Sequence, residues 1–309
     1  MEQEQATIDF LTLNVQDANR ISYIAIVGGG VMGRGIAQTA AGVGFDVLII
    51  ERDDESLERS RTKLIEMLDA EIQRWALTSN EKRAIISRTK FSTELTQVSD
   101  CDMVIEAIDE DFAAKKSIFK QLDRICHPRA IFVSNTSTLS LTKLAEVTSR
   151  PDKMIGMHFL NPVPRVPLVE VVRALKTSDE TFEKTRKFAE DLGKTVVEVY
   201  EYPGFVTTRV ILPMLNEAMQ VYLEGIASAE GIDTAIRLGY GLNVGPLEMA
   251  DSMGLDEVLT WLESLYHELG DSKYRPSPIL RRKVREGKLG KKTGEGFFKY
   301  DESGRRIAQ

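Results

Sequence analysis

The stretch YIAIVGGGVMGRGIAQTAAGVGFDVLIIER, residues 23–52, decides the fold of this chain. It begins and ends with continuous apolar runs, which are typical of parallel strands that helices cover on both faces. Between these runs a glycine-rich turn opens a helical segment. The order strand, turn, helix and strand predicts the βαβ unit of a doubly wound sheet.

Three glycines of the turn, Gly28, Gly30 and Gly33, match the spacing GxGxxG. Glycines at these positions let the backbone approach a pyrophosphate, and the helix start at Val31 and Met32 offers free N–H groups to it. A single match of this kind is weak by itself, because a tight turn can be purely structural. Its place after a strand and before a helix is what the dinucleotide-binding fingerprint requires.

Glu51 ends the second strand of this unit. A carboxylate at that position accepts hydrogen bonds from the adenosine ribose and repels a 2′-phosphate, so it predicts NAD as the cofactor. The neighbouring Arg52 keeps NADP as the alternative, since a guanidinium attracts that phosphate.

Apolar runs and helical stretches alternate as far as Tyr202-Pro203-Gly204, after which the apolar spacing is helical almost throughout. The first part therefore predicts a Rossmann-like, mainly parallel sheet, and the second a smaller all-helical domain. The elements expected in the first part are a helix over 54–75, a strand over 103–108, a helix over 113–125, a strand over 130–135, the strands MIGMHF, LVEVV and TVVEVY, and a helix over 178–192. The predicted division is a polar extension (1–20), an NAD-binding domain (21–202) and a helical domain (203–309).

Composition narrows the class of protein further. The 309 residues carry a formal net charge of −7, which gives no electrostatic footprint for nucleic acid or an anionic membrane. The two cysteines form no metal-binding or disulfide pattern, so we expect no metal and a reducing compartment. Neither a signal peptide nor an apolar run long enough to span a membrane is present, which predicts a cytoplasmic protein.

An enzyme that passes a hydride from an alcohol to NAD needs a group that takes the hydroxyl proton, and histidine is the usual one. Of the three histidines, His127 lies in a predicted turn and His267 in a helical run, where surface or packing roles are expected. His158 instead ends a strand, where ligands bind in open α/β sheets. Glu170 in the next strand is a candidate to orient its ring. Spacing alone leaves a catalytic pair and two polar residues beside a core equally open.

Six motifs occur in an order that resembles the 3-hydroxyacyl-CoA dehydrogenase family, especially its short 3-hydroxybutyryl-CoA dehydrogenases. They cover about residues 22–300 and read GGGVMGRGIA, VIEAIDED, SNTSTLS, GMHFLNPVPRVPLVEVV, PGFVTTRV and GKKTGEGFFKY. The resemblance implies NAD-dependent oxidation of an L-3-hydroxyacyl-CoA to the 3-ketoacyl-CoA, or the reverse, in fatty acid metabolism. It also implies a homodimer whose contact lies in the helical domain.

The resemblance assigns roles to single residues. The histidine of HF-x-NP is the acid/base, here His158, and the glutamate of LVEV that pairs with it is Glu170. Ser137, after SNT, lies near the substrate hydroxyl and the nicotinamide, and Asn161 also positions the reacting oxygen. The implied contacts with the cofactor come from Glu110, Lys115, Asn135 and Lys292.

Some of these residues also have a plainer interpretation. Without the resemblance, Glu110 and Lys115 read as a surface charge pair at i,i+5. Lys63 and Arg74, in the helix after Glu51, lie where the family meets the CoA phosphates, but a solvated helix face is the alternative.

Two departures from the family pattern concern the substrate. Thr208 stands where the family commonly has a substrate-contacting asparagine, and Pro167 stands where acyl-CoA enzymes often have lysine. In having a proline at this position, the chain resembles relatives that act on small hydroxy acids, such as the carnitine and gulonate dehydrogenases. We therefore keep two alternatives to a CoA thioester as the substrate: a free hydroxy acid and a carrier-protein thioester. A noncatalytic protein that binds NAD is kept as the alternative to an enzyme.

Overall fold

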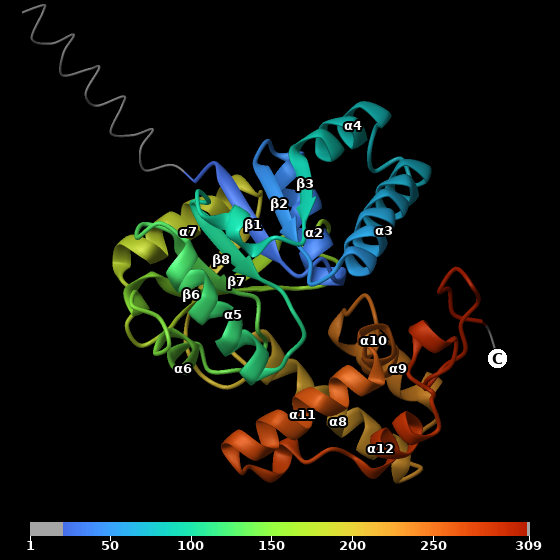
Figure 1. The fold of residues 1–309 in the computed structure, drawn as a ribbon. Helices are drawn as coiled ribbons and strands as arrows, with labels where there is room; N and C mark the ends of the chain where they lie inside the picture. Colours follow the sequence, from blue (N-terminus) through green and yellow to red (C-terminus); the bar gives the residue numbers. More distant parts are fainter. Residues whose placement is uncertain (1–20, 308–309) are drawn as a thin grey trace, which may run out of the picture. The chain divides into compact units, whose positions relative to one another are not determined.

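The computed structural model describes residues 21–307, so the extension predicted for residues 1–20 lies outside the described residues. The chain forms two compact units that divide between Glu201 and Tyr202. The first unit is built on a sheet with helices against it, and the second is built from helices (Figure 1).

The sheet of the first unit has eight strands in the order β3-β2-β1-β4-β5-β6-β7-β8. Every neighbouring pair is parallel except β6 and β7, which are antiparallel. This confirms the predicted Rossmann-like, mainly parallel sheet. The strands are β1 (Tyr23–Val27), β2 (Asp46–Ile50), β3 (Thr89–Ser92), β4 (Met103–Glu106), β5 (Ile131–Ser134), β6 (Met154–Phe159), β7 (Leu168–Arg173) and β8 (Thr195–Tyr200).

Helices cover both faces of this sheet, which is why its inner strands are apolar without alternation. In β1, Ile24 and Ile26 pack into one buried cluster, while Ala25 and Val27 pack into another on the opposite face. Helices α2, α3, α4 and α7 contribute to the first cluster, and α5 and α6 to the second. Their bounds are α2 (Val31–Gly42), α3 (Asp54–Gln73), α4 (Ser79–Arg88), α5 (Phe112–Ile125), α6 (Leu141–Ala145) and α7 (Asp179–Asp191).

The segment after α3 contains two elements that sequence analysis did not predict, helix α4 and edge strand β3. A capping box starts α4: the Thr78 hydroxyl accepts from the Glu81 N–H, and the Glu81 carboxylate accepts from the Thr78 N–H. Only Ile85 of this helix is buried, so its apolar signal is faint. Strand β3 is short, and three of its four residues are polar, as edge strands often are.

The second unit packs its helices around a buried cluster of leucines and aromatic rings. Its helices are α8 (Thr207–Leu223), α9 (Ala229–Tyr240), α10 (Pro246–Met253), α11 (Leu255–Leu269) and α12 (Pro278–Arg285). Asp251 of α10 is buried, and its carboxylate accepts from the N–H groups of Phe297 and Phe298 and from the Tyr300 hydroxyl, each at 2.9 Å. The glycine-rich tail is therefore a packed loop, because one carboxylate fixes it to the helical core.

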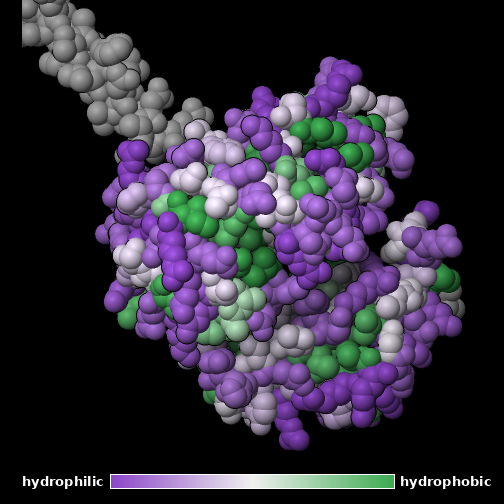
Figure 2. Space-filling model, viewed as in Figure 1, coloured by the Kyte–Doolittle hydropathy of each residue, from purple (hydrophilic) through white to green (hydrophobic). Residues whose placement is uncertain are grey.

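The surface seen in Figure 2 is mostly hydrophilic, with smaller hydrophobic areas between. No helix within residues 21–307 is long and apolar enough to cross a membrane. Four 3-10 turns complete the described elements: η1 (Leu95–Val98), η2 (Pro151–Lys153), η3 (Ser272–Tyr274) and η4 (Lys291–Thr293).

Candidate functional site

The glycine turn lies where β1 ends, at the point where the strand order reverses between β2 and β4. In doubly wound sheets this switch point is where ligands bind. Gly28 has a φ of 100°, and a Cβ there would stand 2.7 Å from the carbonyl oxygen of Ala107. A Cβ on Gly33 would lie 1.9 Å from the Gly28 carbonyl oxygen, so close helix-strand packing requires glycine. Around Gly30, in contrast, a Cβ would meet nothing within 4 Å, which leaves room for a ligand.

The start of α2 suits the pyrophosphate of a dinucleotide, and the end of β2 suits its adenosine ribose. Gly30 caps α2 without a side-chain hydrogen bond, no acidic residue occupies the first turn, and Val31 is exposed. The free N–H groups and the helix dipole thus favour a pyrophosphate. Glu51 accepts the Gly29 N–H through Oε1 at 2.9 Å, and within residues 21–307 its Oε2 has no hydrogen-bond partner. That second oxygen is the expected acceptor for ribose hydroxyls, so these residues fit NAD.

His158 and Glu170 meet because of strand register. They stand directly opposite each other in the antiparallel pair β6 and β7. Side chains at opposite positions point to the same face of a sheet. His158 Nδ1 lies 2.6 Å from Glu170 Oε2, and both residues are buried.

Ser137 completes a chain of three residues. Its Oγ lies 3.1 Å from His158 Nε2. A carboxylate only accepts hydrogen bonds, so the nitrogen facing Glu170 carries a proton and Nε2 is left to gain or lose one. Nε2 of the neutral ring then accepts a hydrogen bond from the Ser137 hydroxyl. The arrangement is that of a base held in one tautomer by a carboxylate.

The two asparagines at the strand ends have different surroundings. Asn135 follows β5, and its Oδ1 accepts from the Phe159 N–H at 3.1 Å, so it ties β5 to the end of β6. Asn161 is exposed beyond β6, just before a cis bond to Pro162.

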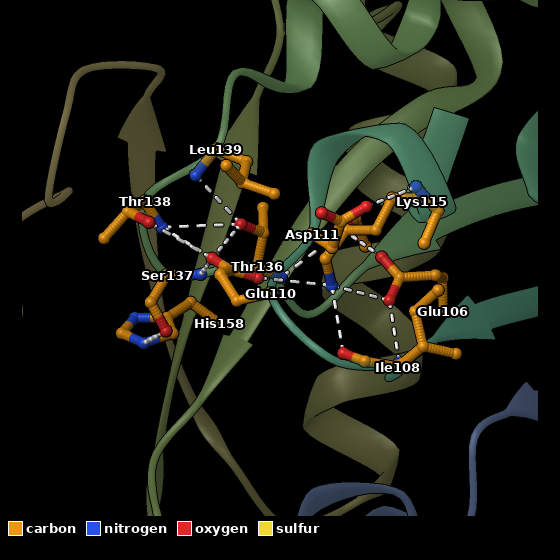
Figure 3. A network of polar contacts seen from close by, with 12 residues as sticks. Glu106, Ile108, Glu110, Asp111, Lys115, Thr136, Ser137, Thr138, Leu139 and His158 are labelled. Atoms are coloured by element: carbon orange, nitrogen blue, oxygen red, sulfur yellow. Dashed lines mark hydrogen bonds and ion pairs between the residues drawn. The ribbon is translucent and has the colours of Figure 1, made fainter. Parts of the chain in front are cut away.

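Glu110 organises the loop that carries Ser137 (Figure 3). Its Oε1 accepts from the N–H groups of Ser137 (2.9 Å) and Thr138 (3.1 Å) and from the Thr136 hydroxyl (2.5 Å). Burial opposes the charge on Glu110, but the Lys115 ammonium and these donors outweigh it and lower the pKa of this carboxyl.

Lys115 contacts both Glu110 and Glu106. Its Nζ lies 2.6 Å from Glu106 Oε1 and 3.2 Å from Glu110 Oε2, and it donates to the Ile108 carbonyl at 3.3 Å. The side chain of Lys115 is 1% exposed. The interpretation of Glu110 and Lys115 as a surface charge pair is therefore wrong, because the side chain of Lys115 is buried beside Glu106 of β4.

The other predicted site residues lie on α3 and in the second unit. Lys63 pairs with Glu66 at 2.8 Å, and Arg74 lies 3.7 Å from Glu71; both basic side chains are more than half exposed. In the second unit Thr208 is buried in the first turn of α8, and Lys292 pairs with Asp256 at 2.5 Å.

His127 and His267 lie in a turn and on an exposed helix surface, respectively. The His127 Nδ1 accepts the Arg129 N–H at 3.1 Å.

Two buried charged residues beside the site, Glu106 and Lys194, were not predicted from the sequence. Glu106 accepts from Lys115, from the Ile108 N–H and from the Ser134 hydroxyl. Its signal was a glutamate inside the otherwise apolar run MVIEAI. Lys194 is buried and donates to the carbonyls of Val163 (2.5 Å) and Val166 (2.8 Å), so it holds the loop between β6 and β7. No local pattern announces this lysine, since its partners are backbone atoms distant in sequence.

Comparison with known proteins identifies the family. Residues 23–202 match the model described as "3-hydroxyacyl-CoA dehydrogenase, NAD binding domain", and residues 204–300 match "3-hydroxyacyl-CoA dehydrogenase, C-terminal domain". The chain is 48% identical over 282 residues to a probable 3-hydroxybutyryl-CoA dehydrogenase of Bacillus subtilis, which covers 91% of this chain and 98% of that relative.

Two solved structures are also similar. The (S)-3-hydroxybutyryl-CoA dehydrogenase PaaH1 from Ralstonia eutropha has a TM-score of 0.85 and 44% identity, covering 91% of this chain and all of that one. FadB2 of M. tuberculosis has a TM-score of 0.89 and 36% identity with the same coverage. With both family models matched in order and the nucleotide turn intact, this chain belongs to the 3-hydroxyacyl-CoA dehydrogenase family and uses NAD.

Proposed function

We propose that the chain oxidises an L-3-hydroxyacyl-CoA, such as 3-hydroxybutyryl-CoA, to the 3-ketoacyl-CoA, or catalyses the reverse reaction. The observation that carries this proposal is the chain Ser137–His158–Glu170 in a member of this family. A base held by a buried carboxylate is what oxidation of a secondary alcohol needs, because the hydroxyl proton must leave as the hydride does.

When bound, NAD supplies the acceptor for the hydride from substrate C3. His158 takes the hydroxyl proton at Nε2 in the oxidation and returns it in the reduction. Glu170 accepts a hydrogen bond from the His158 Nδ1–H throughout, so it stabilises the charged ring that forms. Ser137 and Asn161 then orient the reacting oxygen, and Thr208 contacts the substrate.

The remaining predicted contacts are part of the same proposal. The pyrophosphate and ribose of NAD would bind at the start of α2 and at Glu51. The nicotinamide half would meet the residues that the family resemblance indicates: Asn135, Glu110, Lys115 and Lys292.

For the CoA phosphates we propose Lys63 of α3 and Arg74, the C-cap of that helix. Their support is that both basic side chains are more than half exposed. Among residues 21–307, each is paired only with a carboxylate three positions away in the chain, which a phosphate can replace.

The test is an NADH-absorbance assay with purified full-length protein and 3-ketoacyl-CoA substrates of different length and branching. We expect NADH consumption with acetoacetyl-CoA, and a much slower reaction with NADPH because Glu51 repels the 2′-phosphate. Absence of turnover with every thioester, while NADH still binds, would favour the noncatalytic alternative.

One observation supports a second substrate class. Thr208 and Pro167 replace an asparagine and a lysine of the family pattern, and threonine offers one hydroxyl in place of an amide's paired groups. Free 3-hydroxy acids and a carrier-protein thioester therefore belong in the same panel. Faster turnover of a free acid than of its CoA ester would assign the enzyme to that class.

We also propose a homodimer that forms through the second unit. Large apolar side chains are exposed there at the N-cap of α8 and on α8 and α9, namely Val206, Val210, Leu238 and Tyr240. The proposal is that these side chains form one patch at the dimer contact, because large contiguous apolar patches mark interaction sites. A cytoplasmic location is proposed with it, since Cys101 and Cys126 are both buried free thiols, as in proteins of reducing compartments.

A further inference from the structure

We infer that Glu110 is a positioning residue of the reaction: it fixes the loop of residues 136–138 so that the Ser137 hydroxyl points at His158. This inference rests on the proposed function, and it differs from the contact with the cofactor that the family resemblance indicates for Glu110. Figure 3 shows the carboxylate of Glu110 directed into this loop, with His158 on the loop's far side.

The loop has few other bonds that would determine where Ser137 lies. Glu110 Oε1 takes the N–H groups of two consecutive residues, Ser137 and Thr138, at 2.9 and 3.1 Å. Both hydroxyls that flank the serine, those of Thr136 (2.5 Å) and Thr138 (3.3 Å), donate to the same oxygen. One carboxylate oxygen thus determines the backbone position of Ser137, and through it the 3.1 Å contact with His158 Nε2.

The second oxygen of the Glu110 carboxylate is also fixed, by a buried ion pair next to it. This oxygen lies 3.2 Å from Lys115 Nζ, and Lys115 is fixed by Glu106 Oε1 at 2.6 Å. The Glu106 carboxylate in turn accepts from the Ser134 hydroxyl at 2.6 Å, at the end of β5. The buried pair of Glu106 and Lys115 therefore anchors Glu110 to the sheet, on the strand that leads into the loop. Buried charges in such a network keep a fixed geometry because every bond is satisfied.

The chemistry explains why this loop must be fixed. The serine hydroxyl is useful only when it reaches both Nε2 and the substrate oxygen, and misplacement of a reacting group by about 1 Å costs up to ~100-fold in rate. Glu110 acts on the rate through Ser137, without touching the reacting atoms.

A double-mutant cycle between Glu110 and Ser137 tests this role, with kcat for acetoacetyl-CoA reduction and Kd for NADH as readouts. At saturating NADH, Glu110→Ala should lower kcat by about 10-fold to 100-fold, in addition to the weaker NADH binding expected from loss of its proposed cofactor contact. In the Ser137→Ala enzyme, which has already lost the hydroxyl, adding Glu110→Ala should change kcat by less than about twofold. Glu110→Gln should recover part of the loss, because its amide oxygen still accepts from the two N–H groups.

The matched control is Asp109→Asn, which removes the adjacent exposed carboxylate; within residues 21–307 that side chain has no hydrogen bond or ion pair. It should leave kcat within about twofold of the wild-type value. Equal losses of kcat from Glu110→Ala in both backgrounds, measured at saturating NADH, would overturn the role. If Glu110→Ala does not fold, the cycle is run with Glu110→Asp, whose shorter side chain cannot span the same bonds, and the same comparison decides. Absence of wild-type turnover would instead overturn the proposed function and this role with it, whereas wild-type turnover with an additive cycle overturns this role alone.

Discussion

The distance of 2.6 Å between His158 and Glu170 follows from one pair of facing positions in β6 and β7. A shift of the register by one residue would turn one of the two side chains to the other face of the sheet. The apolar neighbours Met157, Phe159, Val169 and Val171 are buried and hold that register, so the core geometry also fixes the base.

Substitution of Glu170 by glutamine should therefore lower turnover and change its pH dependence. A hydrogen bond to a charged group contributes about 1.5–3 kcal/mol, so we expect a loss of about tenfold or more in kcat. Oxidation needs the neutral ring, and without the carboxylate the charged ring forms less readily. The pH–rate profile of the oxidation should therefore differ from that of the wild type, as steady-state rates between pH 5 and 9 would show. An unaltered profile would contradict the orienting role.

At the scale of single residues, the sequence indicated the functional residues better than it indicated which of them are in contact. His158 and Glu170 were found from a strand end and a neighbouring glutamate, but only register brings them together. Glu110 and Lys115 came from resemblance, and spacing suggested a surface pair that the buried lysine contradicts. Glu106 and Lys194 escaped because a buried charge is recognised by its partners, which are distant in sequence.

In two loops of this protein, the side-chain carboxylate of a residue elsewhere in the chain accepts the loop's backbone N–H groups. Glu110 holds the loop between β5 and α6, and Asp251 holds the tail loop after α12. In both cases backbone N–H groups that no strand or helix can pair are satisfied by one side chain. The local glycines and polar residues therefore indicate a loop, while its structure depends on a residue elsewhere.

The pKa of Glu110 makes the first loop sensitive to acid. Because this pKa is lower in the folded protein than the ordinary 4.5, the carboxylate adds stability above pH 4.5, and that contribution is lost as the pH falls through the folded value. The difference in unfolding free energy between wild type and Glu110→Gln should stay constant from pH 7 to about 5 and shrink below about 4.5. Urea unfolding at several pH values measures it. The difference for Asp109→Asn should show no such decline, and a flat difference for Glu110→Gln would refute the account.

Loss of Asp251 should destabilise the second unit. Asp251→Ala leaves two buried N–H groups and the Tyr300 hydroxyl without an acceptor, at a cost of about 3 kcal/mol or more. Trp261 packs against the core of this unit, so its fluorescence during urea unfolding reports the change. The neighbouring Ser252→Ala, at an exposed position, is the control and should cost no more than about 0.5 kcal/mol. Equal stability of the two variants would show that the loop does not depend on Asp251.

Elements with a strong apolar period were predicted to within a few residues, and elements without one were missed. Helix α5 was expected over 113–125 and spans Phe112–Ile125, because its buried face is clear. Helix α4 and strand β3 were not expected, since they bury few side chains and depend on contacts with α2 and β2.

For the whole molecule, the βαβ unit at residues 23–52 was enough to predict the class of fold. Both faces of the sheet are buried, and the change to helical spacing after residue 202 indicated the helical unit. The antiparallel pairing of β6 and β7 was not predicted, although residues 160–167 between them are too few for the crossover that parallel neighbours need. The homodimer stays a proposal that rests on the family resemblance.

The proposed dimer makes a prediction about exposed apolar residues. The double variant Val210→Glu and Leu238→Glu places charges on side chains of α8 and α9 that are 69% exposed, and burial of unpaired charges opposes association. We expect light scattering after size exclusion to give the mass of one chain for this variant and of two chains for the wild type. Trp75→Glu, at a fully exposed position of the first unit, should leave the mass unchanged. A monomeric wild-type protein would contradict the proposal.

The central claim is that His158 moves the proton in an NAD-dependent reaction of a 3-hydroxyacyl-CoA. The most direct measurement is the turnover of acetoacetyl-CoA with NADH by wild type and His158→Gln, with the NADH Kd measured on both proteins. General acid–base catalysis contributes ~10²–10⁴-fold, so we predict at least about a 100-fold loss in kcat with an unchanged Kd for NADH. Near-normal turnover by His158→Gln would contradict the account.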